Sequence, residues 1–373
     1  MEPIHILQVL GTTNLGGAES RIMDLYRHID REKIQFDFLV HTDKPGFFDE
    51  EINGLGGHIY RLPAYRVYNQ NKYIAACRRF FKEHHDFAAV HGHMTSTASI
   101  YLPIAKRAGI PVTIAHARSA GVDGGLKGMA TKLLRRNLSK KTDIMLSCST
   151  PAAEAVFGKS ETREGRVMIL PNAIDTDLFA YQTEQRQQIR EKYHLDGQFV
   201  IGHVGRFHFA KNHAYLLDIF CEIVKKEPDS KLLLLGDGPL REEMEQRAEA
   251  LEISDKVLFL GNQSPVAPYY QAMDAFVFPS RFEGMPGTVV EAQAAGLPCF
   301  VSDTVTKEVK ACDLVSFLPI NIEPEKWAEE VLAVQNKERN SGSEQMKKAG
   351  FDVKEEVKKY ENFYLTGNIS ALR

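Results

Sequence analysis

The chain has little cysteine, and no pattern joins the cysteines it has. Five are scattered over 373 residues, an odd number without a single Cys-x-x-Cys pair. Disulfide frameworks and zinc sites both need paired or clustered thiols. We therefore expect neither of them, and a reducing, cytoplasmic compartment is the simplest expectation.

Long apolar runs and a strong charge excess are also missing. No apolar run approaches the ~20 residues that a membrane-spanning helix needs. The N-terminal MEPIHILQVL has neither a basic segment nor a long apolar core, so we expect no signal peptide. The net charge of −3 gives no field that would attract nucleic acid, and we expect no such partner.

What the sequence does contain is an alternation of apolar strands and amphipathic helices. Strands are expected at 4–11, 35–42, 58–63, 87–93, 111–118, 143–150, 199–207, 231–235, 257–261, 275–278 and 298–305. Alternating strands and helices form parallel, doubly wound sheets with ligand sites at the carboxyl ends of the strands. Because 373 residues are too many for one core, we predict an α/β protein of two Rossmann-like domains, 1–175 and 176–353.

The stretch FPSRFEGMPGTVVEAQAAGLP, residues 278–298, carries the most chemical information. It reads as the end of a strand, a loop rich in glycine and proline, and a helix, and the free amides of a helix N-terminus attract anions. Glu283 and Glu291 flank the turn, and ionised carboxylates accept hydrogen bonds from sugar hydroxyls. A surface loop with two solvated glutamates would explain the same pattern.

The spacing from Glu283 to Glu291, followed by EAQAAGLP, resembles the Glu-x7-Glu signature of retaining GT-B glycosyltransferases, most closely family 4. Similar blocks extend the resemblance over most of the chain. It implies two domains facing across a cleft, with the nucleotide sugar on the second and mainly the acceptor on the first. The amphipathic helix 354–373 would cross back to the first domain. Many members of this family build bacterial exopolysaccharide or lipopolysaccharide.

The block GRFHFAKN is similar to the family's Gly-Arg-x(4,5)-Lys element and supplies Arg206 and Lys211. A leaving nucleoside diphosphate gains negative charge, which these two cations would stabilise. By resemblance, Glu283 orients the donor sugar and Glu291 holds the ribose hydroxyls. Further donor contacts are implied at Gly17, Gly205, Asn212, Gly236, Gly238, Ser264, Val266, Gly284, Met285, Pro286, Gly287, Thr288 and Val289.

Three histidines, His91, His93 and His116, fall at expected strand ends. Each could be a loop histidine whose ring is satisfied by backbone groups. In the family, a histidine that ends the strand after an Ala-Gly-Ile-Pro-Val segment lies near the donor sugar, and His116 matches that position. Ala117 stands where the family often has an acidic residue.

Residues 124–143 read as a basic amphipathic helix, which predicts peripheral contact with an anionic membrane through 127–141, on the inner face of the cell membrane. A solvated helix with its apolar stripe in the core is the alternative. The basic residues are Lys127, Lys132, Arg135, Arg136, Lys140 and Lys141, and the apolar ones are Met129, Leu133, Leu134 and Leu138.

No cofactor and no metal are expected, because the only Asp-x-Asp sequence, at 175–177, lies in the interdomain segment. We predict retaining transfer of a hexosyl unit from a nucleoside diphosphate sugar, with UDP favoured, to a saccharide or lipid-linked acceptor. Attack from the front face is the favoured mechanism. Two alternatives stay open: a UDP-sugar epimerase on the same scaffold, and a non-catalytic nucleotide-sugar-binding protein.

Overall fold

The computed structural model describes residues 2–119, 121, 125–335 and 337–372, without the side chains of 125–127. The chain forms two compact units, one of residues 1–172 with 353–373 and one of residues 173–352. The boundaries expected from the sequence, after residues 175 and 353, lie within a few residues of these. Each unit holds one parallel sheet, which confirms the doubly wound α/β class.

The sheet of the first unit has the strand order β3-β2-β1-β4-β5-β6-β7, and every pair of described strands is parallel. All seven residues of β2 are buried, which accounts for the apolar sequence IQFDFLV. The strands are β1 (Ile4–Leu10), β2 (Ile34–Val40), β3 (Ile59–Arg61), β4 (Ala89–Gly92), β5 (Val112–Ala117), β6 (Ile144–Ser147) and β7 (Val167–Ile169).

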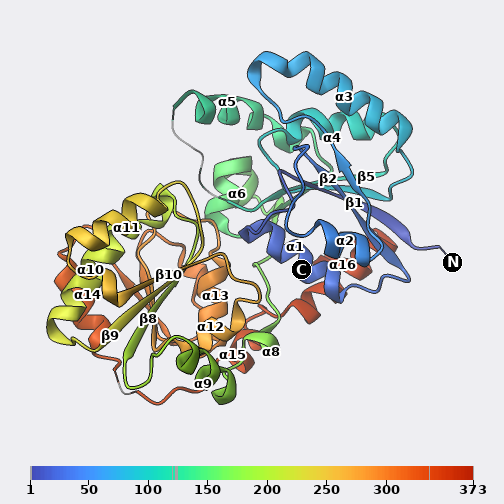
Figure 1. Ribbon diagram of the computed structural model, residues 1–373. Coiled ribbons are helices and arrows are strands. Elements are labelled where there is room, and N and C mark those ends of the chain that lie inside the picture. The colour runs from blue at the N-terminus through green and yellow to red at the C-terminus, as the bar shows by residue number, and fades with distance from the viewer. Residues whose placement is uncertain (1, 120, 122–124, 336, 373) are drawn as a thin grey trace. The chain divides into compact units, whose positions relative to one another are not determined.

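Helices cover both faces of this sheet (Figure 1). The last helix of the chain, α16, packs against α1 and β2, so the C-terminus completes the unit that the N-terminus begins. The helices are α1 (Gly17–His28), α2 (Asp49–Gly54), α3 (Gln70–Glu83), α4 (Ala98–Arg107), α5 (Gly125–Arg135), α6 (Thr150–Phe157), α7 (Lys159–Arg163) and α16 (Val353–Thr366), with single 3-10 turns at Val67–Asn69, Leu138–Lys140 and Ile369–Leu372.

The basic helix expected over 124–143 is shorter than the sequence suggests. Helix α5 ends at Arg135, Asn137 adopts a left-handed conformation with φ of 61°, and a separate 3-10 turn follows. A single left-handed residue stops an α-helix. Lys140 and Lys141 are therefore not part of α5, and the side chain of Lys127 lies outside the described residues. In the described part of the chain, no helix is long and apolar enough to span a bilayer.

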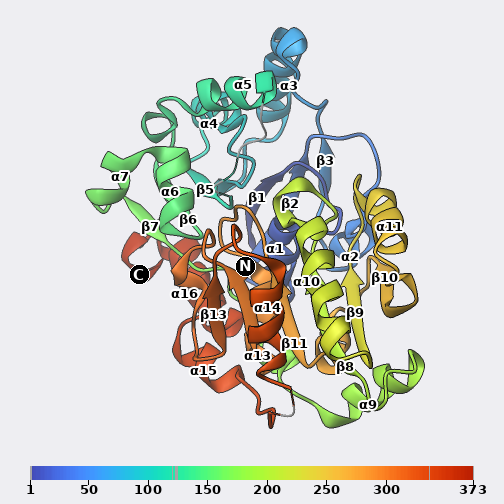
Figure 2. The ribbon, with the colours of Figure 1, turned by 90° about the vertical axis from the view of Figure 1, so that its left-hand side faces the viewer.

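The second unit repeats the plan with the strand order β10-β9-β8-β11-β12-β13, again with parallel pairs throughout its described strands. Figure 2 shows the strands of this sheet in colours from yellow-green to orange. The strands are β8 (Phe199–Val204), β9 (Ser230–Leu235), β10 (Val257–Gly261), β11 (Ala275–Phe278), β12 (Cys299–Ser302) and β13 (Val315–Leu318).

The core of this unit centres on Trp327, which is fully buried and donates its indole N–H to Pro319 O at 2.8 Å. Side chains of α10, α11 and α14 meet it on one face of the sheet. The helices are α8 (Thr176–Phe179), α9 (Thr183–Lys192), α10 (His213–Lys226), α11 (Arg241–Ala250), α12 (Ala267–Ala272), α13 (Gly287–Ala294), α14 (Pro324–Leu332) and α15 (Ser343–Lys348), with 3-10 turns at Phe209–Lys211, Ser254–Lys256 and Lys307–Val309.

Gln293, on α13, is fully buried and uses both ends of its amide. Its Nε2 donates to Val309 O at 2.9 Å, and its Oε1 accepts from the Ala311 N–H at 3.0 Å. The side chain thus satisfies the backbone of the segment that joins β12 to β13. A buried backbone group that loses its partner costs about 1–3 kcal/mol.

We therefore predict that Gln293→Leu lowers the free energy of unfolding of the second unit by about 2–4 kcal/mol, because a carbonyl and an amide lose their partner at once. Trp327 is the only tryptophan, so its fluorescence in urea reports on this unit. Gln188→Leu, at an exposed position of α9, is the matched control and should change little. Equal unfolding midpoints for the two variants would contradict the bracing role of Gln293.

Candidate active site

The candidate donor site of the second unit is built at the carboxyl ends of four parallel strands. Loops follow β8, β9, β10 and β11, and they hold the predicted residues from Gly205 to Met285. Ser264 and Val266 lie in the loop after β10, where Val266 precedes the first residue of α12. Ligands of doubly wound sheets bind at such edges.

The loop after β9 touches both the end of β10 and the loop after β8 through its backbone. The Gly236 N–H donates to Gly261 O at 2.8 Å, and the Phe207 N–H donates to Asp237 O at 3.1 Å. A Cβ at Gly236 would lie 2.2 Å from Gly205 O, and one at Gly238 would lie 2.4 Å from Phe207 O. Both glycines also have positive φ, of 134° and 159°. What the structure shows for them is close packing of two loops; a contact with donor stays a prediction.

Lys211 and Glu283 form an ion pair, with Nζ and Oε1 2.8 Å apart. Both side chains are largely buried, with 19% and 15% of their surface exposed. The ammonium also lies 4.6 Å from the centre of the Phe278 ring, where a cation is attracted to the ring face. The predicted diphosphate cation and the predicted sugar-orienting carboxylate are therefore direct partners.

Asn212 fastens the two loops that carry this pair. Its Nδ2 donates to Pro279 O at 3.1 Å, and its Oδ1 accepts from Arg281 at 2.8 Å. A backbone bond from the Arg281 N–H to Ala210 O, 2.7 Å long, runs beside them. The buried Asn212 thus holds the two loops together, and its contact with a donor stays a prediction.

Arg206 differs from Lys211 in having no partner. It is exposed, and across the described residues its guanidinium makes no hydrogen bond or ion pair. An unpaired arginine at the end of a parallel strand is available to an anionic ligand, which it can hold with two parallel hydrogen bonds.

Helix α13 begins beside the ion pair, after the buried loop Gly284–Pro286. Gly287 and Thr288 lie in its first turn, where a helix offers no acceptor for its own N–H groups. The Thr288 hydroxyl is buried without a hydrogen-bond partner, and Val289 is fully buried behind it. The first turn therefore presents donors of the kind that bind phosphate oxygens.

Glu291 lies one turn further along α13 and is buried. Its Oε2 accepts a hydrogen bond from the Tyr270 hydroxyl at 2.7 Å, which fixes the carboxylate. Tyr270 comes from α12 and is itself fully buried, with its ring near Phe276 and Phe179. The sequence analysis missed Tyr270, since YYQAM there resembles an ordinary buried helix.

In the first unit, His116 belongs to a buried cluster with His91 and His93. His91 Nε2 and His116 Nδ1 are 3.0 Å apart, and His91 Nδ1 contacts the Tyr364 hydroxyl at 2.7 Å. Arg118 Nε donates to His93 Nδ1 at 3.3 Å, so the other nitrogen of His93 carries the proton that it donates to Gln8 at 2.9 Å. The rings are held by side chains, not by the backbone.

Burial, and then the charge of Arg118, hold the pKa of His91 and of His116 well below its ordinary value; burial and neighbouring charges do the same for His93. The three rings are neutral, and one nitrogen of each lies within 4.8 Å of the others, close enough to share a metal ion. Protein hydrogen bonds already occupy both nitrogens of His91 and of His93, however, and Arg118 would repel a cation there.

Comparisons with known proteins match each of the two parts of the chain to a glycosyltransferase model. The model "Glycosyltransferase Family 4" matches residues 15–178, and the model "Glycosyl transferases group 1" matches residues 185–352. The chain is 34% identical to "Putative glycosyltransferase EpsF" of Bacillus subtilis over 98% of this chain and 97% of that one. It belongs to the family 4 glycosyltransferases.

Other glycosyltransferases extend this picture. The "UDP-Gal:alpha-D-GlcNAc-diphosphoundecaprenol alpha-1,3-galactosyltransferase" of Escherichia coli is 28% identical over 60% of this chain and 59% of its own. The structure of Anabaena Alr3699/HepE in complex with UDP and glucose superposes with a TM-score of 0.79 at 16% identity, over 99% of this chain and 100% of that chain. WaaG, described as a glycosyltransferase involved in lipopolysaccharide biosynthesis, has a TM-score of 0.69 at 16% identity, covering 98% and 97%. The fold is GT-B.

Within this glycosyltransferase, most of the predicted site residues gather at one edge of the second sheet. Gly17 and His116 belong to the other unit: Gly17 is the exposed first residue of α1, and His116 is buried. Arg118 was missed, although it follows His116 closely in the chain; its partners His93 and Asn172 are distant in sequence. The roles of all these residues in binding and catalysis stay predictions.

We predict that Tyr270→Phe weakens the binding of a nucleoside diphosphate about 3–10-fold, because Glu291 loses the hydrogen bond that orients it, worth about 1 kcal/mol. Calorimetric titration measures the change. Tyr215→Phe, which removes a hydroxyl bonded to Ile322 O at 2.7 Å elsewhere in the unit, is the control and should leave affinity unchanged. Equal affinities for both variants would remove Glu291 and Tyr270 from the donor site.

A second prediction concerns Glu356 of α16, whose Oε1 has no hydrogen-bond partner. Burial raises the pKa of Glu356 to about 7, partly offset by Arg118 and Arg21. Between its unfolded pKa near 4.5 and about 7, the folded chain holds a proton that the unfolded chain releases, so stability falls as pH rises through that window. Glu356→Gln should therefore stabilise the protein at pH 8, by up to about 3 kcal/mol, and have little effect at pH 4.5.

Circular dichroism in urea at the two pH values measures this difference. Glu355→Gln, on the exposed side of the same helix, is the control and should show no such pH-dependent gain. A Glu356→Gln variant that is equally stable relative to the parent at both pH values would contradict a raised pKa.

Proposed function

We propose that this glycosyltransferase moves a hexosyl unit from a UDP-sugar to a hydroxyl of a saccharide or lipid-linked acceptor, with retention at the anomeric carbon, in cell-surface polysaccharide synthesis. The observation that carries the proposal is the charge arrangement of the second unit. An unpaired Arg206, the Lys211–Glu283 ion pair and the first turn of α13 lie at the same edge of the sheet.

The arrangement suits a reaction whose leaving group becomes more negative. As the bond from the anomeric carbon to the β-phosphate oxygen breaks, Arg206 and Lys211 stabilise the charge on the diphosphate. The amides of Gly287 and Thr288 add to this at the positive end of the helix dipole. A preorganised donor of this kind is worth roughly 3–4 kcal/mol of activation free energy.

Lys211 has a second task, because Glu283 is its partner. In the proposed complex Glu283 accepts hydrogen bonds from the donor sugar while Lys211 fixes its carboxylate. A carboxylate held in an ion pair is a poor nucleophile, so we propose front-face attack. The acceptor oxygen bonds to the anomeric carbon on the face that the diphosphate leaves, and its proton passes to a leaving phosphate oxygen.

Two further points support the choice of donor and chemistry. The Escherichia coli relative is named for a UDP-galactose donor, and Alr3699/HepE was solved with UDP-glucose. Arg206 and Lys211 supply the positive charge that a divalent ion supplies in other enzymes, so we propose that no metal is required. His116, a buried imidazole, would line the reaction centre.

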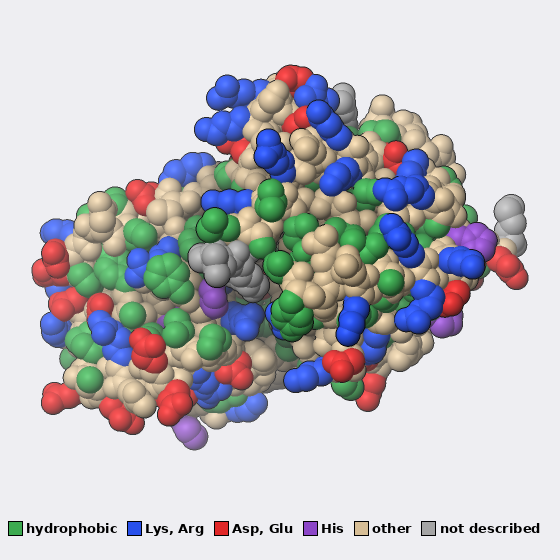
Figure 3. Space-filling view, turned by 90° about the horizontal axis from the view of Figure 1, so that it is seen from above, with side chains coloured by type: hydrophobic (Ala, Val, Ile, Leu, Met, Phe, Trp, Pro, Cys, Tyr) green, Lys and Arg blue, Asp and Glu red, His purple; other side chains and the backbone are tan. Residues whose placement is uncertain are grey.

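We also propose that the first unit contacts an anionic membrane, where a lipid-linked acceptor would be found. Met129 and Leu133 are large apolar side chains on α5 with 67% and 69% of their surface exposed, and the exposed Lys132 and Arg136 lie beside them. Apolar side chains flanked by cations are typical of helices that lie on a membrane surface. Figure 3 shows more Lys and Arg than Asp and Glu on the face that α3, α4 and α5 cover.

The test is a variant series on glycosyl transfer. Arg206→Ala and Lys211→Ala should each lower kcat about 100-fold or more while weakening UDP binding far less, because the charge they stabilise grows in the transition state. Glu283→Gln should also lower kcat, yet it should bind UDP at least as tightly as the parent, since Lys211 is no longer neutralised. Lys226→Ala, a surface lysine of α10, is the control.

Several outcomes would overturn parts of the proposal. Loss of activity in EDTA, restored by Mg²⁺, would contradict metal independence, and a glycosyl group trapped on Glu283 would contradict front-face attack. Conversion of the sugar nucleotide without any acceptor would indicate an epimerase. A kcat equal to that of the parent in both Arg206→Ala and Lys211→Ala would contradict the proposed donor site.

A further inference from the structure

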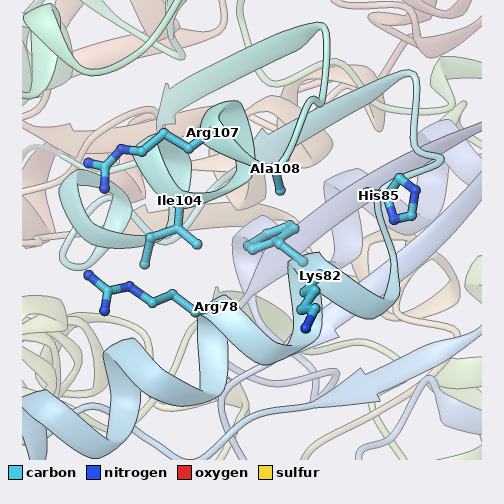
Figure 4. A pocket seen from close by; sticks show the side chains of 7 residues that line it. Arg78, Lys82, His85, Ile104, Arg107 and Ala108 are labelled. Carbon is cyan, nitrogen blue, oxygen red and sulfur yellow. The ribbon is translucent and has the colours of Figure 1, made fainter.

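A basic pocket on the first unit is separate from every residue discussed so far. It has a volume of about 380 Å³ and lies between α3 and α4 (Figure 4). That volume falls within the range of small-molecule sites. Its floor is apolar, formed by Phe81, Ile104 and Ala108, and its rim is basic, formed by Arg78, Lys82, His85 and Arg107.

Helical spacing places these residues together. Arg78, Phe81 and Lys82 follow the pattern i, i+3 and i+4, so they share one face of α3. His85 lines the pocket from the segment that follows the end of α3 at Glu83. On α4, Ile104, Arg107 and Ala108 follow i, i+3 and i+4. The two helices pack against each other with these faces toward the pocket.

The rim carries positive charge, and no acidic side chain that the structure describes pairs with it. Arg78, Lys82 and Arg107 are exposed, and in the described part of the chain none of them pairs with an acidic side chain or forms a side-chain hydrogen bond. No acidic residue is among the described residues that line the pocket. In Figure 4 the guanidinium groups of Arg78 and Arg107 extend to the same side of Ile104.

Helix dipoles explain only part of this arrangement. Lys82 and Arg107 lie in the last turns of their helices, where cations are favoured in any protein. Arg78 does not, and like charges at i and i+4, as in Arg78 and Lys82, destabilise a helix. A bound anion would turn this repulsion into attraction.

We propose that this pocket binds a phosphate ester that carries an apolar group. The guanidinium groups of Arg78 and Arg107 would take the phosphate oxygens, since arginine binds phosphate through two parallel hydrogen bonds. The apolar group would cover Phe81 and Ile104, and Lys82 and His85, which lie on the other side of Ile104 from the two guanidinium groups (Figure 4), would border it there. The chemistry is shared by two sources, an anionic phospholipid in a bilayer and a free amphiphilic phosphate.

Calorimetric titration of the full chain with dihexanoyl phosphatidic acid, which is soluble as a monomer, tests the pocket. Inorganic phosphate, which lacks the apolar part, should bind more weakly. The double variant Arg78→Glu/Arg107→Glu should weaken binding at least tenfold, while Arg79→Glu, an exposed neighbour on α3 outside the pocket, should weaken it less than threefold. Circular dichroism checks that each variant is folded.

Ala108→Leu is a second variant that leaves the charge unchanged. The leucine side chain extends into the pocket. The variant should therefore weaken the binding of dihexanoyl phosphatidic acid at least tenfold and the binding of inorganic phosphate much less. This variant separates a built pocket from a general attraction of anions to a basic face.

Sedimentation with phosphatidylcholine vesicles, with and without phosphatidylglycerol, distinguishes the two sources. Binding to the anionic vesicles that falls in the double variant assigns the site to a membrane lipid. Vesicle binding that is equal in parent and double variant, together with binding of the soluble probe, assigns it to a free ligand. The proposal is wrong if no probe distinguishes the double variant from the parent, or if Arg79→Glu has the same effect as the double variant.

Discussion

The ion pair between Lys211 and Glu283 is the contact on which the candidate donor site depends. It joins the loop after β8 to the loop after β11, two strands that are neighbours in the sheet but far apart in the chain. Asn212 and Arg281 lock the same two loops with hydrogen bonds, and α13 begins immediately after them. A single charged contact therefore sets the positions of the cation, the carboxylate and the helix terminus together.

In the first unit, the polar groups are buried histidine rings instead of a charged pair. Its histidine cluster is buried, and the proton position of His93 is set by Arg118 and Gln8 instead of by solvent. Such a cluster offers fixed hydrogen-bond donors and acceptors whose state does not vary with physiological pH. The second unit thus holds paired charges at the edge of its sheet, whereas the first holds buried rings without charge partners of opposite sign.

The sequence was enough to predict the parallel sheets, because buried strands such as β2 and β9 are short apolar runs bounded by turns. Most of the residues that the sequence singled out lie at one edge of the second sheet, and their role as donor contacts stays a prediction. The sequence was not enough for α5, where one left-handed residue, Asn137, ends a helix whose pattern of apolar residues continues. The sequence did not point to Tyr270 or Arg118, because each forms its hydrogen bond with a residue that is distant in the chain. These partners are Glu291 for Tyr270 and Asn172 for Arg118.

The discontinuity of the first unit has a consequence for biosynthesis. Residues 353–373 complete a structure that residues 1–172 begin, whereas residues 173–352 form a unit without interruption. On the ribosome, the second unit can fold as soon as it emerges, but the first must wait until α16 has been made and has emerged before that helix can cover its sheet. The usual N-to-C order of domain folding is therefore reversed for the last step, and the apolar surface that α16 covers, near Tyr26 and Phe36, is exposed until then.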